Sequence, residues 1–122
     1  MTEDEILSFV QRSVRSVWAL ELLLLLRRER GQAWRLEDLV RELRSSDAAV
    51  DGALESLHSA GYVTTDPGEH FRYAPASPHL DEMAERIEAV YAAKPMAVAK
   101  AIMSAPNDKL RIFADAFKLK DR

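Results

Sequence analysis

Apolar side chains recur at helical spacing through the first part of the chain, at Leu7, Val10, Val14, Val17, Trp18, Leu22 and Leu25. This repeat predicts one helix from about Glu3 to Arg30. Thr2 and Glu5 have the pattern of a capping box at the start of that helix. Residues 18–26 are apolar nearly all round the helix, which is typical of a central helix that is covered on several sides.

The following segment alternates between helical and extended patterns. The predicted order is an extended piece (33–35), a helix (36–44), a tight turn at Ser45 and Ser46, a helix (47–60) and two short strands (62–65 and 70–73). Gly61 suits a left-handed backbone after the second helix, and Gly68 tolerates a positive φ in the turn between the strands. Arg35 stands where a Ser, Thr or Asp cap is usual, so the first of these helices begins without a good cap.

The rest of the chain predicts three further helices. One ends near Ala93, the next is opened by Pro95, and the last covers residues 109–120. We therefore divide the chain into an N-terminal part (1–78) and a C-terminal helical extension (79–122) that closes the core or forms a dimer.

The order of elements in residues 14–74 resembles the winged helix-turn-helix of bacterial transcriptional regulators, with MarR-like and related families closest. The resemblance rests on Leu36, Leu39, Val40, Val50, Ala53, Leu54, Leu57, Gly61, Tyr62, Val63 and the turn that follows. It implies a mainly α fold with a small β-wing and with flanking N- and C-terminal helices. It also implies that the second helix recognises DNA, that residues 66–72 form the wing, and that the flanking helices form a homodimer.

The charge pattern differs from that of a typical DNA-binding surface. The net charge is −3, and residues 31–61 hold three arginines against six acidic residues. The exposed start of the second helix presents Asp47, Ala48, Asp51, Gly52 and Glu55, and that helix contains no lysine or arginine. Bases are usually read by Arg, Lys, Asn or Gln, and phosphates are held by cations. The candidates left for DNA contact are Arg41, Arg44, Ser46 and Arg72.

Two functions therefore stay open. The first is a dimeric transcriptional regulator that binds DNA weakly or with assistance, through the three arginines, Ser46 and the second helix. The alternative is a winged-helix fold used as a protein-interaction module, whose face of Asp47, Ala48, Asp51 and Glu55 meets a basic partner. The resemblance places DNA binding first, whereas the surface charge favours the second function.

The two ends of the chain are candidates for self-association. Ile6, Leu7, Phe9 and Val10 extend beyond what a winged-helix core needs, so we expect them to pair with a second copy, although packing within one chain explains them nearly as well. The segment 109–120 carries two phenylalanines among basic residues. It is expected to close the core or a dimer interface, with a membrane surface or an acidic partner as alternatives.

Other functions find little support in the sequence. The histidines (His58, His70 and His79) lack metal-ligand spacing, and cysteine is absent. No phosphate-binding loop or nucleophile elbow is found, so we expect neither an enzyme nor a cofactor. The acidic N-terminus differs from a secretory signal, and the longest apolar run, residues 22–26, is too short to span a bilayer. We expect a cytoplasmic protein that does not bind membranes.

Overall fold

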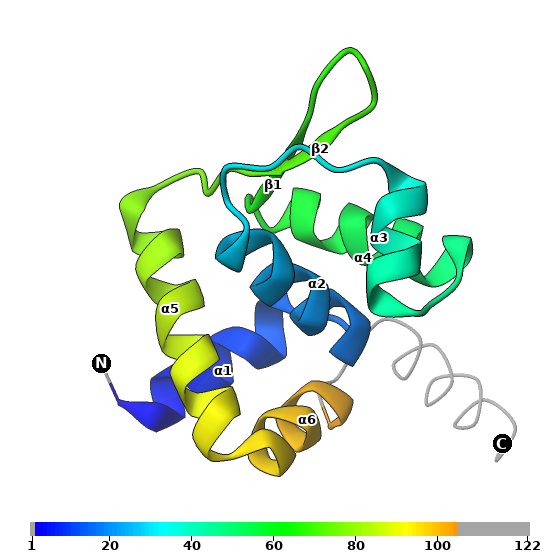
Figure 1. Ribbon diagram of the computed structural model, residues 1–122. Coiled ribbons are helices and arrows are strands. Elements are labelled where there is room, and N and C mark those ends of the chain that lie inside the picture. Colours follow the sequence, from blue (N-terminus) through cyan, green and yellow to red (C-terminus); the bar gives the residue numbers. More distant parts are fainter. Residues whose placement is uncertain (1, 105–122) are drawn as a thin grey trace, which may run out of the picture.

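The computed structural model describes residues 2–104, which form a mainly helical fold with one two-stranded antiparallel sheet (Figure 1). This confirms the expected fold class at the level of its secondary structure. The elements are α1 (Glu3–Ser13), α2 (Val17–Arg28), α3 (Leu36–Leu43), α4 (Asp47–Ser59), β1 (Val63–Thr65), β2 (Phe71–Tyr73), α5 (Pro78–Ala93) and α6 (Pro95–Met103). The expected helix at 109–120 lies outside the described residues.

The central element is α2, as its apolar composition predicts (Figure 1). It packs most extensively against α4 and also contacts α3, α5 and β2. Its buried side chains are Ala19, Leu20, Leu22, Leu23, Leu24, Leu25 and Leu26. Each fully buried leucine stabilises the fold by about 2 kcal/mol, so this one helix supplies much of the apolar core.

The prediction of one continuous helix from Glu3 to Arg30 is wrong, because the chain turns between α1 and α2. Val14 has an extended backbone (φ −109°, ψ 113°), and Ser16 caps α2 by accepting a hydrogen bond from the Ala19 N–H at 3.0 Å. The turn lets α1 pack on α5 and α6 while α2 packs on α4. Val14 is still buried, so the apolar repeat continues through the break and hides it.

The expected pair of helices with a tight turn is present as α3 and α4. Ser46 caps α4 by accepting from the Ala49 N–H at 3.2 Å. The start of α3 is better capped than the residue at Arg35 predicts, because the Asp38 carboxylate accepts a hydrogen bond from the Arg35 N–H at 3.3 Å. Asp38 thereby supplies one half of a capping box, although the Arg35 side chain offers no acceptor.

The hairpin of β1 and β2 projects from the helices (Figure 1). Val63 pairs with Tyr73 and Thr65 with Phe71, so each strand begins one residue later than expected. The expected extended piece is also present, since Trp34 exchanges two backbone hydrogen bonds with Phe71, at 2.9 and 2.7 Å.

Side chains from three places hold α5 in position: Tyr62 just before β1, Tyr73 of β2 and Arg27 of α2. The Tyr62 hydroxyl donates to the Leu80 carbonyl at 2.8 Å, and the Tyr73 hydroxyl donates to the Asp81 carboxylate at 2.5 Å. Arg27, whose side chain is only 13% exposed, lies within ion-pair distance of three carboxylates of α5. These carboxylates are Asp81, Glu85 and Glu88, and the shortest contact, to Glu88, is 3.1 Å.

Packing within one chain covers much of the N-terminal helix, although Leu7 and Phe9 are only partly buried, and pairing with a second copy stays a prediction. Ile6 and Val10 are buried, and α1 contacts α5 and α6 of the same molecule. Pro95 opens α6 as predicted. Among the described residues, no helix has the length and apolar character needed to cross a bilayer.

Two glycines allow a matched test of the backbone. Gly61 has φ +86°, and an added Cβ would lie 3.2 Å from the Leu80 side chain. Gly52 lies within α4 with open space around it. We expect Gly61→Ala to lower the free energy of unfolding by about 1–2 kcal/mol and Gly52→Ala to raise it by about 1 kcal/mol. Urea unfolding of both variants measures the two effects, and equal stabilities would contradict the assigned backbone.

Candidate functional site

The exposed side of α4 is an acidic face, made up of Asp47, Ala48, Asp51 and Glu55. All four residues are exposed, whereas Val50, Ala53, Leu54 and Leu57 on the other side of the helix are buried. The residues of the predicted recognition face therefore do lie together on one surface. That surface carries three carboxylates and no cation from α4 itself.

A shallow groove borders this acidic face. It has a volume of about 320 Å³ and runs between α4 and the hairpin. Its lining residues are Asp51, Leu54, Glu55, His58, Val63, Thr65 and Phe71. The acidic face and the groove together form a surface with carboxylates at its edge and apolar side chains at its base.

The predicted DNA-contacting arginines are exposed, but most of them lie close to carboxylates. Arg41 Nη2 is 3.5 Å from Asp38, and Arg72 Nε is 3.9 Å from Asp66. These side chains are 77% and 50% exposed, respectively. Exposed pairs of this kind contribute little energy, so they leave both arginines accessible while reducing the net positive charge around them.

Arg44 differs from the other arginines in its backbone. It lies between α3 and α4 with φ 51° and ψ 47°, a left-handed conformation in which glycine is the usual residue. The Ser45 N–H donates to the Val40 carbonyl across it at 3.1 Å. Arg44 is exposed, and within the described residues it takes part in no ion pair. Ser46, the fourth candidate, is occupied in capping α4.

The tip of the hairpin is held by Asp66. One oxygen of its carboxylate accepts hydrogen bonds from the Gly68 and His70 N–H groups, each at 2.9 Å. The same oxygen is 3.2 Å from His70 Nδ1. The bond from the His70 N–H lowers the pKa of Asp66 most, and together these bonds hold that pKa below its usual range. The positive φ of this turn falls at Glu69 (62°), whereas it was expected at Gly68.

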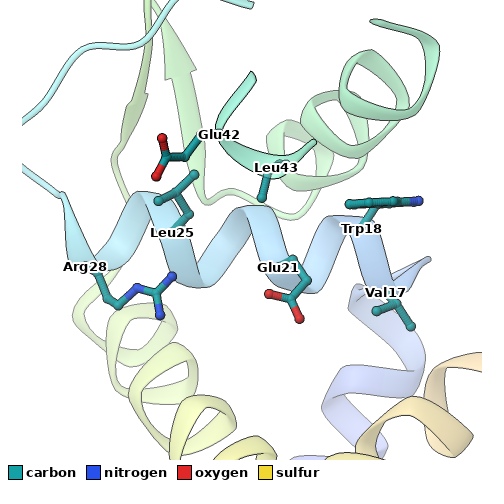
Figure 2. A pocket seen from close by; sticks show the side chains of 7 residues that line it. All are labelled: Val17, Trp18, Glu21, Leu25, Arg28, Glu42 and Leu43. Carbon is teal, nitrogen blue, oxygen red and sulfur yellow. The ribbon is translucent and has the colours of Figure 1, made fainter. Parts of the chain in front are cut away.

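A second surface, not expected from the sequence, lies over α2. A hollow of about 620 Å³ is formed by one side of α2 and the end of α3. Figure 2 shows its lining residues, which are Val17, Trp18, Glu21, Leu25, Arg28, Glu42 and Leu43. The helical repeat assigns Trp18 to the core, but its side chain is 42% exposed at this hollow.

No cluster of three or more His, Cys, Asp or Glu side chains able to hold a metal ion occurs within residues 2–104. The carboxylates of α4 are exposed and lie in no enclosed pocket. The expectation that the protein is not an enzyme stays a prediction.

Comparison with protein-family models, with curated proteins and with solved structures yields no match.

The hydrogen bonds of Asp66 predict a pH-dependent hairpin tip. The lowered pKa means that this stabilisation is complete above the ordinary carboxyl pKa of about 4 and is lost as the pH falls through the lowered value. We expect Asp66→Ala to speed amide hydrogen exchange at Gly68 and His70, measured by NMR at neutral pH. Asp66→Asn is the control, because its side-chain oxygen still accepts both bonds. Unchanged exchange in the alanine variant would contradict the role of Asp66.

Proposed function

We propose that the chain is a winged helix-turn-helix protein that acts as a protein-interaction module. In this proposal α3 and α4 form the helix-turn-helix, and the hairpin is the wing. The observation that carries it is the acidic face of α4. The helix that would enter the DNA groove exposes Asp47, Asp51 and Glu55 and contains no lysine or arginine. Such a face repels a polyanion and attracts a basic surface.

The groove beside α4 supports the same proposal. Leu54, Val63 and Phe71 at its base offer apolar contact next to the carboxylates of Asp51 and Glu55. A partner segment with basic and apolar side chains fits this combination, because interfaces pair an apolar centre with a charged rim. The partner is therefore expected to be a basic, amphipathic protein segment.

A charge reversal tests the proposal. We expect Asp51→Lys/Glu55→Lys to reduce capture of basic proteins from cell lysate on the immobilised protein by about tenfold or more. The matched control is Glu29→Lys/Glu82→Lys, which changes the charge equally at exposed positions outside α4 and spares the carboxylates around Arg27. An equal loss in both variants would indicate a nonspecific charge effect and would contradict a site on α4. Unchanged capture by the Asp51→Lys/Glu55→Lys variant would also contradict it.

One observation favours DNA binding as a second candidate function. Arg44 is held in a left-handed backbone conformation that costs arginine free energy and that glycine would adopt freely. It also stands three residues before Asp47, the first residue of α4, where the positive end of the helix dipole attracts phosphate. A cation kept at such a position is consistent with a phosphate contact.

Arg44→Gly separates this function from stability. We expect the variant to be more stable by about 1 kcal/mol, since the strain is relieved, but to bind random duplex DNA more weakly. Fluorescence anisotropy at about 50 and about 200 mM salt measures the binding constant. The slope of its logarithm against the logarithm of the salt concentration should be smaller in magnitude by about one. Arg44→Lys keeps the charge and serves as the control. Undetectable binding of the unsubstituted protein at both salt concentrations would leave the protein-interaction proposal as the better one.

A further inference from the structure

One side of the central helix is left uncovered by the described residues. Trp18, Glu21 and Arg28 are spaced so that they share one side of α2, and Leu25 lies between them (Figure 2). Glu42 and Leu43 of α3 border the same hollow. The other sides of α2 contact α3, α4, α5 and β2. The hollow is thus a gap in the packing around the helix that contributes most to the core.

The hollow is partly apolar and partly acidic. Val17, Trp18, Leu25 and Leu43 supply its apolar surface. Glu21 and Glu42 bring two carboxylates, against the single cation of Arg28. Glu21 is fixed in position because its carboxylate accepts a hydrogen bond from the Tyr91 hydroxyl at 2.7 Å. The surface therefore suits a segment that is both amphipathic and basic.

The described chain ends close to this hollow. Lys94 and Glu3 form an ion pair of 3.1 Å, which places the beginnings of α6 and α1 together. Figure 1 shows α6 ending near the start of α2, where α1 also ends. Met103, in the last turn of α6, is 73% exposed. The described part of the chain therefore ends near the end of the hollow that Val17 and Trp18 form.

The sequence of those residues matches the hollow in length and chemistry. In a helix over residues 108–120, Leu110, Phe113, Ala114 and Phe117 would share one face. Such a helix would be about 20 Å long, close to the length of about 18 Å that the twelve residues of α2 span. Residues 106–122 carry five basic side chains against three aspartates. Their positive charge complements Glu21 and Glu42.

We propose that residues 108–120 bind as an amphipathic helix in the hollow over α2 of the same chain. The phenylalanine face packs on Trp18, Leu25 and Leu43, and the basic side chains approach Glu21 and Glu42. The segment thereby completes the packing around α2. This inference is independent of the proposed function, because the hollow and the acidic face of α4 are formed by different residues.

Trp18 provides a direct readout once it is the only tryptophan. Trp34→Phe achieves this, because Trp34 is 7% exposed and its buried Nε1 has no hydrogen-bond partner to lose. In this full-length background we expect Phe113→Ser/Phe117→Ser to shift the Trp18 emission to longer wavelength. Its acrylamide quenching constant should rise about twofold, because the indole loses its cover. Ile112→Ser/Leu119→Ser, on the opposite face of the predicted helix, is the matched control and should leave both quantities unchanged.

A peptide of residues 106–122 separates loss of docking from loss of folding. Added to the Phe113→Ser/Phe117→Ser protein, this peptide should restore the protection of Trp18. A peptide that itself carries Phe113→Ser and Phe117→Ser should not. Unchanged quenching in the phenylalanine variant, an effect in the control alone, or failure of the peptide to restore protection would overturn the proposal. Dilution of the full-length protein tests the alternative of a second copy. If analytical ultracentrifugation shows a dimer that dissociates on dilution, and the protection of Trp18 falls over the same concentrations, the hollow binds a second copy and binding within one chain is overturned.

Discussion

Burial of α2 is the constraint on which the rest of the structure depends. Its run of leucines from Leu22 to Leu26 has apolar side chains on every side, so no single neighbouring element can cover it. Helices α3, α4 and α5 and strand β2 each cover part of its surface. The chain must turn after α1 for the same reason, because a continuous helix would carry α1 away from α5 and α6. The acidic face of α4 is then directed outward, because α4 packs on α2 with its apolar side.

The local signals in the sequence predict the elements from α3 to β2 well. Ser46 caps α4, Gly61 takes up its left-handed conformation, and Arg72 lies on the exposed side of β2 between Phe71 and Tyr73, as alternation predicts. These features depend on residues that are close in sequence, so they can be derived from spacing and backbone preference. The positions of Asp47, Asp51 and Glu55 on one exposed face follow from the helical repeat in the same way.

The features that could not be predicted depend on contacts between distant residues. The break between α1 and α2 is hidden because Val10 and Val14 are both buried, so the apolar repeat runs through it. Ser16 was the available signal, since a serine before Val17 and Trp18 is a good helix cap. The helical spacing of Trp18 predicts a core position, but the hollow beside Trp18 depends on where α3 packs along α2, and the spacing does not contain this information. The left-handed backbone of Arg44 is likewise set by how α3 and α4 pack, and arginine gives no sign of it.

Charge and backbone strain favour different functions for the same pair of helices. The carboxylates of α4 are a property of the whole exposed face, and their repulsion of DNA acts over about a Debye length, or ~10 Å at 0.1 M salt. The strain at Arg44 is local, and it bears on one cation at one position of the turn between α3 and α4. A single cation cannot offset three carboxylates that lie on the helix expected to read bases. The acidic face is therefore the stronger argument, and a DNA contact through Arg44 would require further cations beside it.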